Sequence, residues 1–248
     1  MLQRAAALAP LLLLASSLPL AGCAADVAST GDTSQDQALR TYVDANTEHP
    51  EVGILRTSAG YCTGTLIGPR TVLSAAHCFK FGSAVAADDA PALGTFTLFA
   101  GGKNIRYEFH RERVDANVLE VKFDLSVTQL DVAVSPATAT PATIADAWPD
   151  DGTLTVYGYG RYGQGCASQN TDMTKRKTNV PPSFPFVKAT TCPGDSGGPY
   201  FKTGTSEIVA TVKGDGLGLE WVADAVRYRD WILKQRDASE RGALAIDD

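Results

Sequence analysis

The stretch Thr-Thr-Cys-Pro-Gly-Asp-Ser-Gly-Gly-Pro, TTCPGDSGGP at residues 190–199, surrounds one serine, Ser196, with three glycines, two prolines and an aspartate, Asp195. Glycine permits backbone conformations and close approaches that other residues do not, and proline restricts its own backbone. These residues around a single hydroxyl indicate that the backbone next to Ser196 has an unusual conformation. Ser196 is therefore the first candidate for a reactive group.

A second segment, CTGTLIGPRTVLSAAHC at residues 62–78, holds His77, which small residues precede and Cys78 follows. A histidine that takes a proton from a hydroxyl needs its ring held in one orientation. Cys62 stands just before two short expected strands. A disulfide between Cys62 and Cys78 would bridge these strands and help to fix the ring.

Together the two segments resemble the histidine and serine segments of the trypsin/chymotrypsin-like serine peptidases, and they occur in that family's order. The resemblance extends over roughly residues 48–235. It implies an all-β fold of two packed six-stranded antiparallel Greek-key barrels with a C-terminal α-helix. It also implies a boundary between the barrels near residues 136–149 and a site in the cleft between them. The chain has no CxxC spacing, so we expect no zinc site, and we expect no cofactor.

The residue pattern itself also predicts an all-β fold. The 23 glycines and 13 prolines are scattered along the chain, which favours many turns and short strands. Strand and helix patterns do not alternate, which argues against a parallel α/β sheet. The best helix candidate is Val226–Gln235. The expected strands are Val52–Leu55, Thr63–Ile67, Thr71–Ser74, Phe96–Phe99, Val132–Val134, Leu154–Tyr157 and Ile208–Val212.

The mechanism that the resemblance implies is acyl transfer, in which the serine hydroxyl attacks a peptide carbonyl and the histidine takes its proton. By position in the motifs, Ser196 is the nucleophile and His77 is the base. The backbone N–H groups of Gly194 and Ser196 would form the oxyanion hole. The expected substrate is a protein or peptide, and the protein is expected to be a monomer.

Two aspartates are candidates for orienting His77. Asp131, in LDVAV, fits the family motif better, because β-branched and small neighbours suit a buried strand and Phe123 precedes it by eight residues. Asp124, in FDLSV, follows His77 by 47 residues, a more usual spacing than the 54 of Asp131. A surface loop insertion expected at Ser83–Leu93 accounts for most of the excess. Asp131 is therefore the preferred acid.

The segment where activation would occur departs from the family pattern. Trypsin-like enzymes commonly pair the aspartate before the nucleophile, here Asp195, with a new N-terminus of IVGG type. Residues 38–44 of this chain read Ala-Leu-Arg-Thr-Tyr-Val-Asp instead. Because a buried, unpaired carboxylate is costly, we expect either another partner for Asp195 or a cut, for example between Arg40 and Thr41.

The specificity pocket departs as well. In the family, the residue six before the nucleophile lies at the base of the primary pocket, and an aspartate there selects Arg or Lys. This chain has Thr190 at that position, so we expect a neutral P1 side chain. Thr211, Val212 and Lys213 correspond to the wall of the pocket and are expected to line the substrate.

The five cysteines divide into two groups. In the family, a cysteine at position 192 would have its usual partner near residues 214–218, where this chain has no cysteine. Cys192 is therefore expected to pair with Cys166. Setting Cys23 aside leaves four cysteines, an even number suited to an oxidising compartment.

The N-terminus predicts export. A positively charged start, an apolar run and Leu-Ala-Gly-Cys at residues 20–23 describe a signal peptide over residues 1–22. The last four residues resemble a bacterial lipobox, so Cys23 would be acylated and would hold the protein on a membrane; without the lipid it would be secreted. Residues 23–47 then form a flexible tether, residues 48–238 the peptidase domain and residues 239–248 a tail.

A net charge of −6 argues against a surface that binds nucleic acid. Three hypotheses remain. The first is an exported, membrane-anchored serine endopeptidase. The second is a catalytically silent binding or regulatory protein of the same fold, which the absence of IVGG favours. The third is an esterase that uses the same residues.

Overall fold

The computed structural model describes residues 45–79, 93–114, 124–163, 166–171, 173–182, 186–188, 190–216 and 219–242 of the 248-residue chain. The signal-peptide, lipid-anchor and most of the tether predictions, like most of the predicted insertion at Ser83–Leu93, lie outside these residues. Among the described helices, none is long and apolar enough to cross a membrane.

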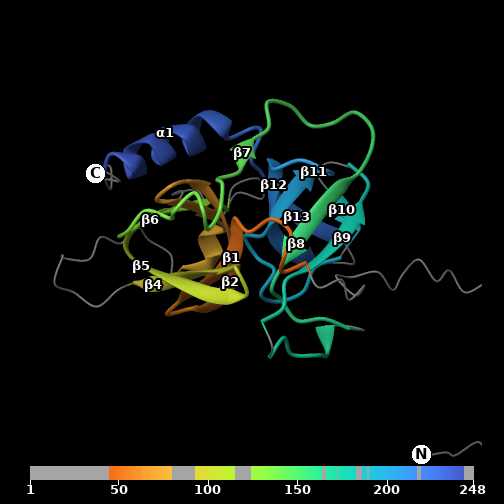
Figure 1. Ribbon diagram of the computed structural model, residues 1–248. Coiled ribbons are helices and arrows are strands. Elements are labelled where there is room, and N and C mark those ends of the chain that lie inside the picture. The colour runs from red at the N-terminus through yellow and green to blue at the C-terminus, as the bar shows by residue number, and fades with distance from the viewer. Residues whose placement is uncertain are drawn as a thin grey trace, which may run out of the picture. The chain divides into compact units, whose positions relative to one another are not determined.

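The first half of the chain forms a closed antiparallel barrel of six strands, drawn from orange to yellow-green in Figure 1. Side chains such as Leu66, Phe96 and Phe109 are fully buried and fill its interior. Around the barrel the strands follow the order β1 (Val52–Thr57), β2 (Gly60–Gly68), β3 (Thr71–Ser74), β6 (Ser126–Leu130), β5 (Lys103–Val114) and β4 (Gly94–Ala100).

The second half forms a seven-stranded sheet with its own core, which includes Leu154, Val156 and Tyr200. The short strand β7 (Thr143–Ile144) pairs in parallel with β12, and the other pairings are antiparallel. The order of these other strands is β10 (Phe186–Lys188), β13 (Leu219–Asp224), β12 (Glu207–Gly216), β11 (Pro199–Lys202), β8 (Leu154–Gly158) and β9 (Arg176–Val180).

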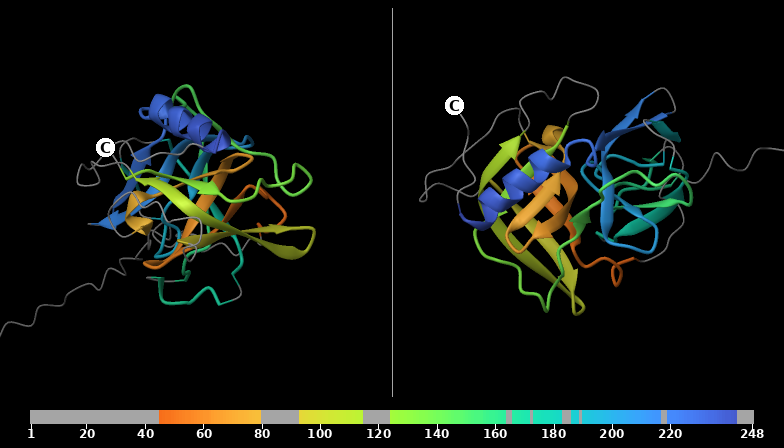
Figure 2. Two further views of the ribbon diagram at one scale, coloured as in Figure 1. Left: turned by 90° about the vertical axis from the view of Figure 1, so that its left-hand side faces the viewer. Right: turned by 90° about the horizontal axis from the view of Figure 1, so that it is seen from above.

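A third cluster of buried side chains joins the two halves. It includes Leu73 and Val127 from the barrel and Phe201 and Ile208 from the second sheet. The helix α1 (Arg229–Glu240) follows the second sheet but returns to the barrel, where it packs on β2, β3 and β6 and buries Ile232 (Figure 2). The expected fold class, a mostly β trypsin-like architecture with a C-terminal helix, is confirmed.

Two predictions of local structure are wrong. Residues 132–134 form no strand, and Val132 is two-thirds exposed; the strand before them is β6. The predicted tail is in part structural, because α1 continues to Glu240. The Glu240 carboxylate accepts hydrogen bonds from the Arg70 N–H (3.0 Å) and the Thr71 hydroxyl (2.5 Å). The end of the helix thereby closes the turn between β2 and β3.

Candidate active site

Asp124 and His77 form the centre of the candidate site. The imidazole Nδ1 of His77 lies 2.7 Å from Asp124 Oδ2, and the backbone N–H of His77 donates to Asp124 Oδ1 at 2.8 Å. The carboxylate is 3% exposed, whereas the histidine side chain is 37% exposed. One buried carboxylate therefore holds the histidine by both its ring and its backbone, and leaves the other side of the ring open to solvent.

The register of two neighbouring strands brings these residues together. Ser74, at the end of β3, pairs with Ser126, at the start of β6. His77 follows Ser74 in the short helix η2 (Ala76–Cys78), and Asp124 precedes Ser126, so both lie at the same edge of the barrel. The Ser126 hydroxyl fixes this edge further by donating to the Ala75 carbonyl (3.1 Å).

Asp124 has a strained backbone. Its φ of 110° lies in a region that residues other than glycine rarely adopt. Its carbonyl accepts the N–H of Ala76 at 3.2 Å, so both its backbone and its side chain bind the turn that carries His77. Strain of this kind persists only where surrounding contacts impose it, and here those contacts orient the carboxylate.

The preference for Asp131 as the partner of His77 is wrong. Asp131 follows the opposite end of β6, and seven residue steps at about 3.3 Å each place its backbone roughly 20 Å from that of Asp124. Asp131 Oδ2 instead lies 2.7 Å from Nδ1 of a different histidine, His110 in β5. The candidate that the sequence ranked second, Asp124, is the one that contacts His77.

The serine segment lies against the histidine segment. The Ser196 carbonyl accepts the N–H of Thr63 in β2 at 2.9 Å, and the Cys78 sulfur lies 3.9 Å from the same carbonyl. Gly197 makes this approach possible, since a Cβ there would be 2.1 Å from the Ser74 hydroxyl and its φ is +77°. Ser196 itself is half-buried.

The backbone around Ser196 directs most of its polar groups inward. The Gly194 carbonyl accepts the Thr63 hydroxyl at 2.9 Å, and the Gly197 N–H donates to the Val212 carbonyl at 2.7 Å. By contrast, within the described part of the chain the N–H groups of Gly194 and Ser196 have no hydrogen-bond acceptor. Gly194 has a φ of +103°, a conformation that glycine adopts without strain.

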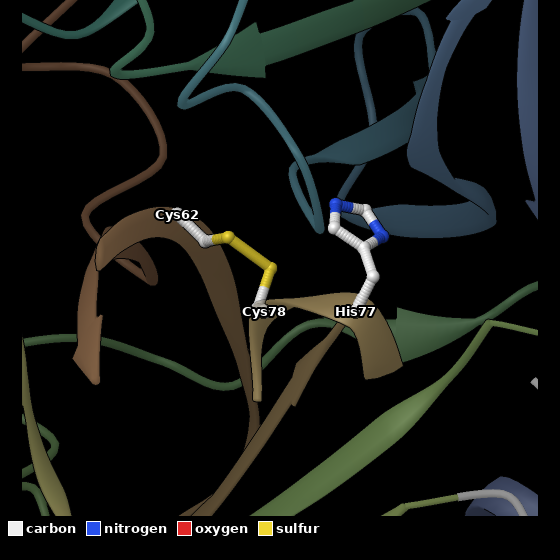
Figure 3. Close-up of side chains that lie close together, drawn as sticks. All are labelled: Cys62, His77 and Cys78. Atoms are coloured by element: carbon white, nitrogen blue, oxygen red, sulfur yellow. A yellow bond between two sulfur atoms is a disulfide. The ribbon is translucent and has the colours of Figure 1, made fainter. Parts of the chain in front are cut away.

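Both expected disulfides are present. Cys62 joins Cys78, the residue after His77, and Figure 3 shows this disulfide beside the His77 ring. Cys166 joins Cys192, four residues before Ser196. The ring of His77 and the sulfurs of Cys62 and Cys78 lie within 4.8 Å of one another. This trio cannot act as a metal site while the disulfide is intact, because neither sulfur is a thiolate.

Comparisons with known proteins identify the family. The trypsin family profile matches residues 40–232, more than three quarters of the chain. This chain belongs to the trypsin family. One similar solved structure is neuropsin, a serine protease expressed in the limbic system of mouse brain, with a TM-score of 0.59 and 20% identity over 79% of this chain and 97% of that chain. At this identity the likeness concerns the fold. No curated protein sequence matches the chain significantly.

The four pocket residues named from the trypsin-family pattern differ in accessibility. Thr211 and Val212 are fully buried, and the expectation that they line the substrate stays a prediction. They lie in β12 beneath the serine segment, where Val212 exchanges backbone hydrogen bonds with Gly197 and Gly198. Thr190 is 6% exposed and Lys213, the residue after Val212, is half-buried.

Two of the partners of Asp195 are backbone N–H groups. The carboxylate is fully buried and accepts two backbone hydrogen bonds of 2.7 Å, from Gly160 N–H to Oδ1 and from Cys192 N–H to Oδ2. Hydrogen bonds of this kind to an ionised carboxylate are short and strong. Backbone groups of this trypsin-family chain thus serve as partners of Asp195.

Sequence reasoning missed Thr63 and Ser74, which join the two segments. The Ser74 hydroxyl donates to the Thr63 carbonyl at 2.8 Å, and the Thr63 hydroxyl accepts the N–H of Tyr159 at 3.0 Å. Both residues carry a hydroxyl and lie in strands expected within residues 62–78. Because a buried hydroxyl needs a hydrogen-bond partner, they could have been predicted to bond to another segment.

His49 resembles a second site but is not one. Its Nδ1 lies 2.8 Å from Glu51 Oε1 and 3.4 Å from the Ser206 hydroxyl. A histidine that passes a proton from a hydroxyl while a carboxylate orients it uses its two ring nitrogens for these two contacts. Here both contacts involve the same nitrogen, so the trio Ser206, His49 and Glu51 is a structural cluster.

Proposed function

We propose that this protein is a serine endopeptidase in which Ser196 is the nucleophile, His77 the general base and Asp124 the acid that orients His77. The trypsin-family fold supports a peptidase. The observation that carries the proposal is the double hydrogen bond from His77 to the buried Asp124 carboxylate, next to the serine segment. The proposed triad differs from the one expected from sequence in its acid.

The hydrogen-bond pattern favours the tautomer of His77 that the reaction needs. An ionised carboxylate only accepts hydrogen bonds, so Nδ1 carries the proton that Asp124 accepts. The other ring nitrogen, Nε2, then has a free lone pair and can take the proton of the Ser196 hydroxyl as its oxygen attacks a carbonyl carbon. Asp124 also stabilises the imidazolium that forms, because its negative charge lies beside Nδ1.

The attack converts the substrate carbonyl oxygen into an oxyanion. The N–H groups of Gly194 and Ser196 are the proposed donors, and their lack of acceptors among the described residues supports this role. One such donor is typically worth about 3 kcal/mol of transition-state stabilisation. The imidazolium gives its proton to the leaving amine, which leaves an acyl group on Ser196 Oγ; a water molecule activated by His77 then releases the acid and restores the hydroxyl.

We further propose a protein or peptide substrate with a neutral P1 side chain, since Thr190 carries no charge that would select Arg or Lys. The half-buried Lys213 is the most accessible of the four pocket candidates and would adjoin the substrate. We also propose an acylated Cys23, a tether that ends before the buried Ala45, and a monomeric peptidase domain that extends through Glu240. The two disulfides indicate an exported protein.

Labelling with a fluorophosphonate probe tests the proposal, because such a probe reacts only with an activated serine. We expect stoichiometric labelling of the wild-type protein and none of Ser196→Ala. A folded wild-type protein that does not label would contradict the proposal and favour a silent binding protein. A P1-diverse peptide library then separates peptidase from esterase activity, and a strong preference for Arg or Lys would overturn the assignment of Thr190.

A further inference from the structure

Tyr61, the residue before Cys62 in β2, lies beside the serine segment. A Cβ at Gly194 would be 2.5 Å from Cε2 of the Tyr61 ring, so the ring can lie this close only because Gly194 has no side chain. Two residues along the strand, the Thr63 N–H donates to the Ser196 carbonyl at 2.9 Å. The half-buried Tyr61 ring therefore adjoins the residue whose N–H is one of the two proposed oxyanion donors.

An exposed positive charge lies next to this ring. Arg56 in β1 is the cross-strand partner of Tyr61, and its guanidinium carbon is 5.8 Å from the centre of the Tyr61 ring. Its Nη2 lies 3.7 Å from Met173 Sδ. Within the described part of the chain the Arg56 guanidinium has no carboxylate partner, and arginine stays protonated in proteins. Arg56 can therefore attract a negative group of a ligand.

The serine segment lies between β2 and β12. On the β12 side, the Gly197 N–H donates to the Val212 carbonyl at 2.7 Å. On the β2 side, the Ser196 carbonyl accepts the Thr63 N–H. A peptide bound across Ser196 would thus have one part near β12 and the other near β2.

The proposed roles of the neighbouring residues indicate which part lies on which side. Lys213, which is proposed to adjoin the P1 residue, belongs to β12. His77, which would give its proton to the leaving amine, is linked to β2 through the Cys62–Cys78 disulfide. The part of the substrate that departs with this amine would therefore run along β2, past Tyr61.

The charge of Arg56 would act on this leaving part over a short range. An extended peptide advances about 3.3 Å per residue, so the guanidinium is within about two residue lengths of a substrate residue that contacts Tyr61. The chain has a net charge of −6, which repels acidic peptides in general. Salt largely screens exposed charges beyond about 8 Å, so the nearby Arg56 outweighs distant carboxylates.

We propose that Arg56 makes this protein prefer substrates that carry a carboxylate on the second to fourth residue after the scissile bond. This inference rests on the proposed function and concerns the leaving part of the substrate, whereas Thr190 and Lys213 concern the P1 residue. Arg56 is a binding residue in this account and takes no part in the proton transfers.

The first experiment compares two quenched-fluorescence peptides. They share a P1 residue and preceding sequence chosen from the P1-diverse library, and the second to fourth residues after the scissile bond are Glu in one peptide and Gln in the other. We expect kcat/KM to be about three- to fivefold higher for the Glu peptide, because an exposed ion pair contributes little. In about 1 M salt the two values should converge, since the charges are then screened.

Two results would contradict the inference in different ways. Equal kcat/KM values at low salt, in a protein that the fluorophosphonate probe labels at Ser196, would overturn the preference and leave the proposed function standing. A folded protein that neither labels nor cleaves either peptide would overturn the proposed function and this inference with it.

The second experiment assigns the preference to one side chain. Arg56→Gln should abolish it, Arg56→Glu should reverse it, and Arg56→Lys should keep most of it. The control Arg106→Gln, which removes an exposed arginine that pairs with Glu108 in β5, should leave the preference unchanged. Because the probe has no peptide on the leaving side, its labelling rate should stay within about twofold of the wild type in all four variants.

The charge reversal separates binding from a structural role of Arg56. A preference for the Glu peptide that survives Arg56→Glu would overturn the inference. A loss of labelling that parallels the loss of peptide hydrolysis in Arg56→Gln would also overturn it, because Arg56 would then support the site and not bind the substrate.

Discussion

Two histidine–aspartate pairs lie at opposite ends of β6, and they have almost the same contact. In each pair Nδ1 of the histidine is 2.7 Å from a carboxylate oxygen. His77 and Asp124 lie at the start of the strand; His110 and Asp131 lie at its end. The contact alone therefore does not distinguish a candidate catalytic pair from a surface pair.

Burial and neighbours do distinguish them. Asp124 is 3% exposed and also binds the His77 backbone, whereas Asp131 is 37% exposed. The serine segment packs beside His77, while His110 sits at a bulge in β5. A carboxylate orients a histidine for catalysis only where a nucleophile is within reach of the other ring nitrogen. In the proposed function, His77 and Asp124 are the pair with such a nucleophile.

Replacing each histidine should give the largest difference between the pairs. If His77 is the general base, His77→Ala should lower kcat by about 10⁵-fold or more, since removing the base of such a triad disables the whole unit. His110→Ala should change kcat less than about twofold. Steady-state hydrolysis of a peptide substrate measures both. Comparable losses in the two variants would remove the distinction between the pairs.

The two histidine–aspartate pairs also differ in that the serine segment packs only beside His77. Two glycines allow the packing of this segment to be tested. Gly197 and Gly204 have φ values of +77° and +81°, but a Cβ would clash with Ser74 only at Gly197, and at Gly204 it would meet open space. We expect Gly204→Ala to cost about 1–2 kcal/mol of unfolding free energy for its backbone conformation. Gly197→Ala should cost about 3 kcal/mol or more and abolish most activity.

Urea unfolding and peptide hydrolysis measured on both glycine variants separate strain from contact. Equal losses of stability would mean that position 197 requires glycine because of its backbone conformation, and not because the serine segment approaches Ser74.

The first pair also depends on a covalent link that adjoins His77. The Cys62–Cys78 disulfide closes a loop of 16 residues, for which loop-closure entropy predicts about 3 kcal/mol of stabilisation. The double variant Cys62→Ala, Cys78→Ala should lose about that much stability in urea. The Cys166–Cys192 disulfide closes 26 residues, and its double variant should lose a similar amount. A loss below about 1 kcal/mol at the first site would show that barrel packing alone holds His77.

A third pair, His49 and Glu51, extends the comparison to stability. Burial by itself would raise the pKa of Glu51, but hydrogen bonds from His49, the backbone and Ser206 outweigh it, so the pKa lies below the ordinary value of 4.5. A lowered pKa means that the ionised carboxylate stabilises the fold above that value, and that this stabilisation is lost as the pH falls through the lowered pKa.

Glu51→Gln should therefore lower the unfolding free energy at pH 7 by about 1.5 kcal/mol. The difference from the wild type should shrink as the pH falls below the ordinary pKa of Glu51. Urea titrations at several pH values check this. A difference that stays constant with pH would mean that the charge of Glu51 contributes nothing.

Long motifs let the sequence predict much of the fold. The segment at residues 62–78 contains β2 and β3 almost complete, and the strand expected at Thr71–Ser74 has the observed bounds. The pattern of apolar residues did not predict a strand whose sequence is largely polar. Ser126–Leu130, with sequence SVTQL, is a fully buried strand with three hydrogen-bonding side chains, whereas the more apolar Val132–Val134 is not a strand. Barrel pairing and burial against β3 and β5 override that pattern.

The error about the acid follows from the error about the strand. The small and β-branched neighbours of Asp131 suggested a buried strand, and for that reason Asp131 fitted the family motif better than Asp124. The register of β3 with β6, which no local motif encodes, instead aligns Ser74 with Ser126 and brings Asp124 to His77. Spacing along the chain favoured Asp124 correctly. For choosing the acid, the types of the residues next to each aspartate were a weaker guide than its distance along the chain from His77.

Measuring kcat for Asp124→Asn and for Asp131→Asn decides which aspartate orients His77, because each substitution nearly keeps the shape of the side chain but removes the carboxylate. We expect kcat to fall about 10⁴-fold for Asp124→Asn, because the amide can present the wrong group to Nδ1, and less than about twofold for Asp131→Asn. Circular dichroism and melting temperature establish that both variants are folded. Full activity in Asp124→Asn, or a large loss in Asp131→Asn, would contradict the assignment of Asp124 as the acid that orients His77.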